Sequence, residues 1–351
     1  MTPITGPEAW LGSQIDYRQE GLHTLSPDQI HEIDSALLAV GDLDFPQITP
    51  KTFPLPSIGP FFRKLGDSLR TGRGFLLLRG LPRDHYSTDD MARIYYGLGA
   101  HIGQPVPQSH MGELLGNVID VSDIEPEARG YHAGGAQRFH TDTCDIVSLM
   151  CLRAAKSGGI SRIASAAAVH NRLLETHSDL LETLHGDYVF RRMERDASLG
   201  SGVLVKPVSI YSRASGSLSC NVSGSYPNRA VAAGDTVMTR RQIEALDEME
   251  RLAASPEFHL DMSIGEGDIQ FLNNRTILHG RTGYEDWPDM VRRRHLLRLW
   301  LHVPSWPDLP ANQGMHGVGD HPGWLRQRRP FMELPSRYLH EMDQRKAAIA
   351  A

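Results

Sequence analysis

The stretch that decides the fold runs from Phe139 to Ser161 and reads FHTDTCDIVSLMCLRAAKSGGIS. It opens with a His-x-Asp pattern at His140 and Asp142 and continues into an apolar run, Ile146 to Leu152, that is typical of a buried strand. Residues two apart on a strand project from the same face, so we expect the imidazole and the carboxylate to converge on one ion. The pattern therefore predicts half of a metal site at the start of a strand.

The chain contains 17 histidines, so a His-x-Asp pattern has to be judged by its setting. Two further copies occur, His177-Ser178-Asp179 and His185-Gly186-Asp187. The first lies in an expected helix, where residues two apart point in different directions. The second stands where that helix is expected to end. Of the three copies, only the one at His140 is expected to bind a metal.

The third ligand has to come from elsewhere in the chain, and His279 is the best candidate. It follows GDIQFLNNRTIL, residues 267 to 278, whose apolar runs would carry it onto an inner strand. Asn273 and Asn274 in this stretch are interpreted either as a turn or as partners that orient His279.

Two imidazoles and one carboxylate on one face of an octahedron are the ligand set of non-haem Fe(II) oxygenases. The open positions would take a 2-oxo acid and O2, and a buried arginine such as Arg294 would pair with the far carboxylate.

The rest of the apolar pattern predicts short strands separated by turns that contain glycine, which is typical of a sandwich or barrel. Strands are expected at 74–82, 115–121, 146–152, 161–164, 188–191, 205–211, 258–262, 268–272 and 295–303. Helices are expected at 26–40, 58–70, 89–98, 167–184, 239–254 and 335–350. We therefore expect a mainly β fold with flanking helices.

We expect one domain with three parts. Residues 1–73 form an N-terminal helical elaboration, residues 74–303 form the β core with helical inserts, and residues 304–351 form a tail. The tail is interpreted as a lid or as a contact in a homo-oligomer, and the sequence does not decide between the two.

Composition excludes several classes of partner. The net charge is −6, with 36 basic and 42 acidic residues, so nothing indicates a nucleic-acid-binding surface. No stretch approaches the roughly 20 apolar residues that span a bilayer, and the first residues do not resemble a secretion signal. The three cysteines, Cys144, Cys151 and Cys220, are odd in number and lack CxxC spacing. We therefore expect reduced thiols, a cytoplasmic location and a small-molecule substrate.

At the quoted residues the chain resembles the taurine catabolism dioxygenase family, Fe(II)/2-oxoglutarate oxygenases with a double-stranded β-helix, or jelly-roll, core. The likeness runs from about Gly74 to Val303 through GFLLLRGLP, FHTDTCDIVSLMCLRAAKSGGIS, GDIQFLNNRTILHGRT and RRRHLLRLWL. It implies a dioxygenase that uses Fe(II), 2-oxoglutarate and O2 and releases succinate and CO2. The reaction it implies is oxidation, in the usual case hydroxylation, of an unactivated C–H bond in a small organic substrate.

The same resemblance implies roles for individual residues. It implies iron ligands at His140, Asp142 and His279. Arg294 would clamp 2-oxoglutarate, and Ser161, where the family more often has threonine, would contact the same carboxylate. Arg298 occupies the position at which taurine dioxygenase binds the substrate's sulfonate, which implies an anionic substrate. Related halogenases replace the carboxylate with a small residue, so the presence of Asp142 argues against halogenation.

Two other functions stay open on this scaffold. A redox-neutral hydrolase or isomerase would use Zn²⁺ or Mn²⁺ and would have no need for Arg294. A non-catalytic jelly-roll binding protein would be expected to lack one of the three ligands. The pocket walls are expected to come from the loops 104–112, 128–137 and 199–202, and their composition does not identify one substrate.

Overall fold

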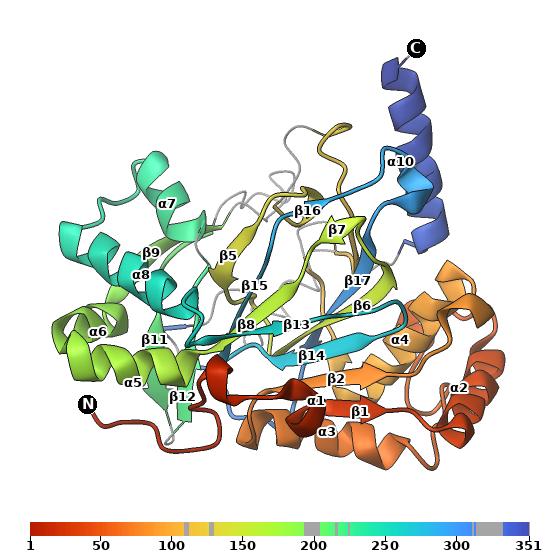
Figure 1. Cartoon of the computed structure of the whole chain (residues 1–351), viewed down its shortest axis with the longest axis horizontal. Helices are drawn as coiled ribbons and strands as arrows, with labels where there is room; N and C mark the ends of the chain where they lie inside the picture. The colour runs from red at the N-terminus through yellow and green to blue at the C-terminus, as the bar shows by residue number, and fades with distance from the viewer. Residues whose placement is uncertain are drawn as a thin grey trace.

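The computed structural model describes residues 1–108, 112–125, 130–192, 204–214, 217–223, 225–310, 312–313 and 333–350. Its larger sheet has seven strands in the order β1-β2-β14-β6-β17-β3, with β4 also paired to β17 (Figure 1). The strands are β1 Leu22–Thr24, β2 Phe75–Arg79, β3 Gln104–Pro105, β4 Leu115–Val118, β6 Ile146–Arg153, β14 Ile269–Asn273 and β17 His295–His302. Every pairing in this sheet is antiparallel except that of β1 with β2.

A second, antiparallel sheet of four strands has the order β13-β8-β15-β5. Its strands are β5 Gln137–His140, β8 Ser161–Ser165, β13 His259–Met262 and β15 Ile277–Arg281. Buried side chains from both sheets share one apolar cluster, which includes Leu77, Val147, Ile163, Met262, Leu272 and Ile277. The two sheets therefore pack face to face.

Helices cover the outer face of the larger sheet. They are α2 Pro27–Val40, α3 Gly59–Thr71 and α4 Thr88–Ile102, and their buried side chains share a cluster with Met150, Phe271 and Leu297 of the sheet. The C-terminal helix α10, Pro335–Ala350, contacts α4. Because helices lie on one face and the smaller sheet on the other, the central strands are apolar on both faces, which explains their continuous apolar runs.

Between β8 and β13 the chain forms an insert lobe, residues 166–253, which lies to the left in Figure 1. Its described elements are α5 Ala166–Thr176, α6 Ser178–His185, β9 Asp187–Arg192, β10 Leu204–Ser209, β11 Tyr211–Ala214, β12 Ser217–Cys220, α7 Ser225–Ala232 and α8 Arg240–Ala253. The lobe has an apolar cluster that also takes in Phe139 and Leu278 of the smaller sheet. Helix α1, Tyr17–Glu20, and the pair β7, Ser157–Gly158, with β16, Tyr284–Glu285, complete the fold.

Most expected elements are confirmed within a few residues, but the balance between helix and strand differs. In the described part of the chain, helices contribute more residues than strands, so the fold is mixed rather than mainly β. The helix expected at 167–184 is two helices, because His177 leaves the helical conformation, with φ −148° and ψ 59°. The strand expected to begin at Phe139 is two strands, β5 and β6, with a loop between them, and helix α7 was not expected. Among the described residues, no helix is long and apolar enough to cross a membrane.

Candidate metal centre

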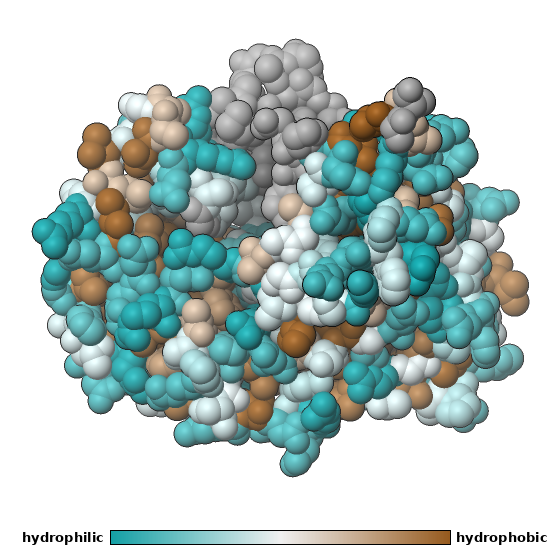
Figure 2. All heavy atoms as spheres, turned by 45° about the horizontal axis from the view of Figure 1, so that its top comes forward, coloured by the Kyte–Doolittle hydropathy of each residue, from teal (hydrophilic) through white to brown (hydrophobic). Residues whose placement is uncertain are grey.

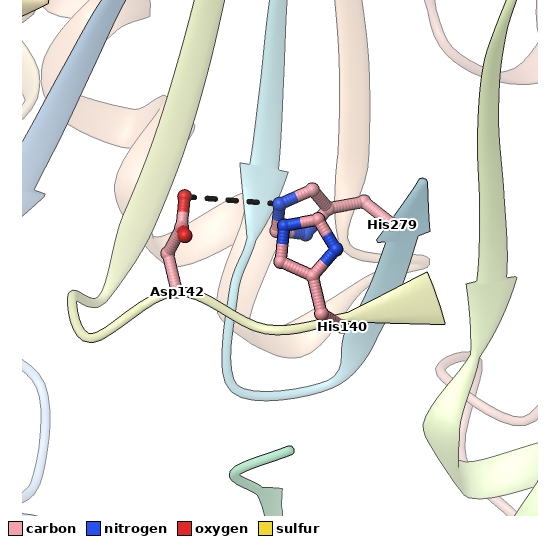
Figure 3. Close-up of side chains that lie close together, drawn as sticks. All are labelled: His140, Asp142 and His279. Atoms are coloured by element: carbon pink, nitrogen blue, oxygen red, sulfur yellow. Dashed lines mark ion pairs between the residues drawn. The ribbon is translucent and has the colours of Figure 1, made fainter. Parts of the chain in front are cut away.

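Three side chains that the sequence singles out meet at the edge of the smaller sheet (Figure 3). His140, Asp142 and His279 each offer one ligand atom, and these atoms lie within 4.8 Å of one another. His140 and His279 are direct partners across β5 and β15, which places their ring centroids 4.3 Å apart. Nε2 of His279 lies 3.7 Å from Oδ2 of Asp142. The structure thus brings together residues 137 positions apart in the chain, as expected from the sequence.

Asp142 belongs to the cluster, but it does not lie on a strand as expected. Strand β5 ends at His140, so Asp142 lies in the loop before β6 and the argument from strand alternation is wrong. The loop is held instead by Asn274, in the turn between β14 and β15. The backbone N–H of Asp142 donates to Oδ1 of Asn274 at 2.8 Å, and Nδ2 of Asn274 donates to the carbonyls of Asp142 and Cys144 at 2.7 and 2.9 Å. Asn274 therefore lies in a turn and also positions a candidate ligand, which is Asp142 rather than His279.

The carboxylate of Asp142 is oriented by Trp300, which the sequence reasoning missed. Nε1 of Trp300 donates to Oδ2 of Asp142 at 2.9 Å. The available signal was strand parity, because Trp300 lies two residues after Arg298 on β17. Burial opposes ionisation of Asp142, but the charge of Arg298 and the nearby imidazole of His279 hold the pKa of Asp142 below its usual range. The carboxylate is therefore ionised at neutral pH, which is the state that can bind a cation.

The imidazole of His140 has a defined orientation. Its Nδ1 donates to the backbone carbonyl of Arg138 at 2.9 Å, which leaves Nε2 as the nitrogen that could bind a metal. Desolvation, followed by repulsion from the imidazole of His279, lowers the pKa of His140 to about 4. His140 is thus neutral at pH 7, as a metal ligand has to be.

Arg294 is buried beside the turn that precedes β8. Its side chain is 6% exposed, and Nη1 has no hydrogen-bond partner among the described residues. The guanidinium lies 5.0 Å from the ring centroid of Tyr284, whose hydroxyl is also buried without a described partner. A Cβ on Gly159 would come within 3.0 Å of Nε, so a glycine at this position makes room for the arginine. A buried cation without a carboxylate is costly, which indicates a site for an external anion.

Ser161 lies on β8, two residues after Gly159. Its hydroxyl is buried and donates to Oε1 of Gln270 at 3.1 Å. The donor that the resemblance assigns to 2-oxoglutarate is therefore engaged by Gln270, so the hydroxyl would have to turn to reach a carboxylate. The role of Ser161 stays a prediction.

Arg298 lies on β17 next to the ligand cluster. Its Nη1 is 3.8 Å from Oδ2 of Asp142, and its Nε donates to Oε1 of Gln108 at 2.7 Å. The guanidinium stands 4.5 Å from the ring centroid of Tyr131 and 5.0 Å from that of Trp300. Aromatic rings on which the guanidinium packs hold it in one orientation without neutralising its charge.

A cavity of about 740 Å³ opens beside these residues. His140, Asp142, Arg298 and Trp300 form its inner end, and residues of α7 and α8 form much of its outer wall. Of the expected wall loops, 128–137 contributes Tyr131 and Gln137. Residues 109–111, 126–129 and 199–202 lie outside the described part of the chain. Helix α7, which the sequence did not indicate, thus contributes to the candidate substrate site.

Comparison with known proteins agrees with this geometry. The model of the family described as taurine catabolism dioxygenase TauD, TfdA family matches residues 42–300. Taurine hydroxylase-like protein SAT17 of Stachybotrys chartarum is 32% identical over 310 residues, 83% of this chain and 77% of that protein. FR-33289 synthase of Streptomyces rubellomurinus is 28% identical over 334 residues, 90% of this chain and 95% of that protein.

Solved structures share the fold. Asparagine oxygenase in complex with Fe(II), 2S,3S-3-hydroxyasparagine and succinate superimposes with a TM-score of 0.62 at 19% identity, over 84% of this chain and 99% of that one. The non-heme iron oxygenase OrfP in complex with Fe and alpha-ketoglutaric acid gives a TM-score of 0.60 at 14% identity, over 80% and 93% of the two chains.

Proposed function

Because the chain belongs to the taurine catabolism dioxygenase TauD, TfdA family, we propose that His140, Asp142 and His279 hold Fe(II) and that Arg294 holds 2-oxoglutarate. The activity that goes with this family is that of a 2-oxoglutarate-dependent non-haem iron dioxygenase acting on a small molecule. One observation carries the residue assignment, namely that ligand atoms of two imidazoles and one carboxylate lie within 4.8 Å of one another. This is the ligand set that leaves open positions for a chelating 2-oxo acid and O2.

The residues fit both groups chemically. His140 is neutral and presents Nε2, and the pKa of Asp142 is held low, so both are in the protonation state that a metal ligand needs. The unpartnered Nη1 of Arg294 fits the far carboxylate of a dicarboxylate. Ser161 is proposed as a second contact to that carboxylate. An arginine that pairs with a dicarboxylate has a role in the oxygenase but none in a redox-neutral Zn²⁺ or Mn²⁺ enzyme. The presence of Arg294 therefore favours the oxygenase.

When bound, iron and 2-oxoglutarate supply an O2-dependent oxidation of a C–H bond, with release of succinate and CO2. The chain's own residues keep the reacting groups in place. Asn274 fixes the loop of Asp142 and Trp300 fixes its carboxylate, so the ligand does not have to be ordered when the metal binds. Arg298 is proposed to bind an anionic group of the substrate and thereby to hold the target carbon next to the metal.

We also propose that the two facing sheets form a double-stranded β-helix, in one domain that extends from residue 1 to residue 351. The antiparallel order of the smaller sheet and the shared apolar cluster between the sheets support this fold. A cytoplasmic location is proposed because all three cysteines are unpaired and buried.

The proposal is tested by following 2-oxoglutarate turnover in protein stripped of metal and reloaded. We expect succinate to form only with Fe(II) and O2, and His279→Ala to abolish its formation. Succinate formation that persists in His279→Ala, or turnover of a substrate with Zn²⁺ and without 2-oxoglutarate, would overturn the assignment.

A further inference from the structure

We propose that the hydroxyl of Tyr284 is a further donor to the far carboxylate of 2-oxoglutarate, beside the guanidinium of Arg294. The inference rests on the proposed function, because it takes Arg294 as the residue that holds this carboxylate. It adds a binding residue that the sequence did not single out.

The hydroxyl of Tyr284 and the guanidinium of Arg294 both lack an acceptor. Oη of Tyr284 and Nη1 of Arg294 are buried, and neither has a hydrogen-bond partner among the described residues. Cζ of Arg294 lies 5.0 Å from the centroid of the Tyr284 ring, so the two groups are neighbours. Figure 2 shows a largely hydrophilic surface on the face that it views, where polar groups can bond to water, but these two groups are cut off from water. Buried donors without partners are destabilising, and one carboxylate would satisfy both.

The backbone holds Tyr284 and Arg294 next to each other. Tyr284 lies on β16, where it pairs with Gly158 on β7. Its N–H donates to the carbonyl of Gly134 at 3.0 Å. A Cβ on Gly159 would come within 3.0 Å of Nε of Arg294 and 3.5 Å of Cβ of Tyr284, so the glycine leaves room for the arginine beside the tyrosine. The two side chains are therefore placed together by the strand pair and not by chance contact of flexible loops.

Two other donors near this position already have acceptors. Arg281 also lies close to the Tyr284 ring, with Cζ 4.7 Å from its centroid, but its terminal nitrogens donate to backbone carbonyls of residues 133–135. Ser161 pairs with Arg281 across β8 and β15, and its hydroxyl donates to Oε1 of Gln270 at 3.1 Å. Of these three side chains in the described part of the chain, Tyr284 is the one whose donor has no acceptor.

The phenol of Tyr284 is in the protonation state that donates. Burial raises the pKa of Tyr284, although the charges of Arg294 and Arg281 oppose the rise. The hydroxyl therefore keeps its proton at neutral pH and can donate to a carboxylate oxygen. A carboxylate has about four acceptor positions, so a bidentate guanidinium leaves some of them open. A phenol beside the arginine can fill one of these.

The test compares 2-oxoglutarate with 2-oxopentanoate, which has a methyl group in place of the far carboxylate. Calorimetry on the anaerobic protein loaded with Fe(II) gives Kd for each. The wild type should bind 2-oxoglutarate about 100-fold more tightly than 2-oxopentanoate. Tyr284→Phe keeps the ring but loses the donor, so its Kd for 2-oxoglutarate should rise about tenfold. Its Kd for 2-oxopentanoate should stay the same.

Two further variants are controls for the loss of a hydroxyl. Tyr86→Phe removes a phenolic donor that bonds to Oδ1 of Asp34 at 2.7 Å, and it should leave both affinities unchanged. Ser161→Ala should weaken 2-oxoglutarate binding less than Tyr284→Phe does, because Gln270 already accepts from Ser161. Thermal unfolding of each variant would establish that it folds.

An unchanged preference for 2-oxoglutarate in Tyr284→Phe would overturn the inference, as would a larger loss in Ser161→Ala than in Tyr284→Phe. An equal loss of affinity for both keto acids in Tyr284→Phe would also contradict it, because the change would then lie at the metal and not at the far carboxylate. A wild type that binds both keto acids equally well would instead overturn the role of Arg294 in the proposed function.

Discussion

The site has two regions, a ligand floor and an apolar wall, and different kinds of interaction hold each of them together. The floor consists of His140, Asp142, Asn274, His279 and Trp300, and short hydrogen bonds join all of these side chains except that of His279 to one another or to the backbone. The apolar wall is the set Val222, Pro227, Ala232, Met238, Ile243 and Leu246, on or beside α7 and α8. These side chains contribute contact area without directed bonds, and polar residues such as Asn228 and Asp247 line the same side of the cavity. The two regions meet where the N–H of Thr141 donates to the carbonyl of Val222 at 2.7 Å.

This difference separates the chemistry from the choice of substrate. A hydrogen-bonded floor tolerates little change, because a shift of one ligand alters the geometry of the metal. A wall of apolar contacts can accept other side chains of similar size with modest effect. We therefore expect substitutions in the floor to act on metal and cosubstrate binding, and substitutions in the wall to act on the substrate alone.

The largest effect is expected for His279→Ala. Loss of one of three ligands should weaken Fe(II) binding by more than about 100-fold, which exceeds the effect usual for losing a hydrogen-bond partner of a ligand. Equilibrium dialysis with Fe(II) under anaerobic conditions measures this change. His177→Ala, in a discarded His-x-Asp pattern on an exposed helix junction, is the matched control and should bind iron normally.

The second-largest effect is expected for Arg294→Met. Removing the buried guanidinium should weaken 2-oxoglutarate binding by about 100-fold, or ~3 kcal/mol, because hydrogen bonds between charged groups are lost. Fe(II) affinity without 2-oxoglutarate should change less than threefold. Calorimetry separates the two, and an equal loss of both affinities would mean that Arg294 supports the fold rather than the cosubstrate.

Asn274→Ala should have an intermediate effect on the metal. It removes three hydrogen bonds to the loop of Asp142 and Cys144, and Fe(II) binding should weaken about 10–100-fold. Asn273→Ala is the control next to it, since Asn273 donates to the carbonyl of Leu69 instead. Both variants should lose roughly 1–3 kcal/mol of stability, but only Asn274→Ala should lose iron. Equal iron affinity in the two would contradict a positioning role for Asn274.

The smallest effect in the floor is expected for Trp300→Phe. The ring keeps its packing, but the donor to Oδ2 of Asp142 is lost, so Fe(II) affinity should fall about tenfold or less. Titrating Fe(II) across pH would show whether the carboxylate needs a higher pH to bind once its hydrogen bond is gone. An unchanged pH profile would show that Trp300 contributes only packing.

The sequence predicts the elements well where the signal is local. Ser26 with Gln29 forms the capping box that begins α2, and the apolar run of β2 is bounded by glycines. The break between α5 and α6 at His177 was missed because the apolar pattern continues across it without glycine or proline. The lobe's α7 was missed because its eight residues are too few for a periodic pattern.

The sequence indicated the three candidate ligands and Asn274, but it did not indicate Trp300 or Gln108. The three ligands carry a recognisable pattern, but the supporting contacts join residues far apart in the chain. Trp300 and Asp142 are separated by 158 positions, and Arg298 and Gln108 by 190. Strand parity could have placed Trp300 on the same face as Arg298, but only the register of β17 against its neighbours brings either residue to its partner.

The most direct test of the floor is the absorption of the anaerobic protein during titration with Fe(II) and then 2-oxoglutarate. A keto acid chelated to Fe(II) gives a metal-to-ligand charge-transfer band, so we predict this band in the wild type and its absence in Asp142→Ala and His279→Ala. Arg294→Met should show it only at much higher 2-oxoglutarate. A band of full intensity in His279→Ala would contradict the assignment of the metal centre.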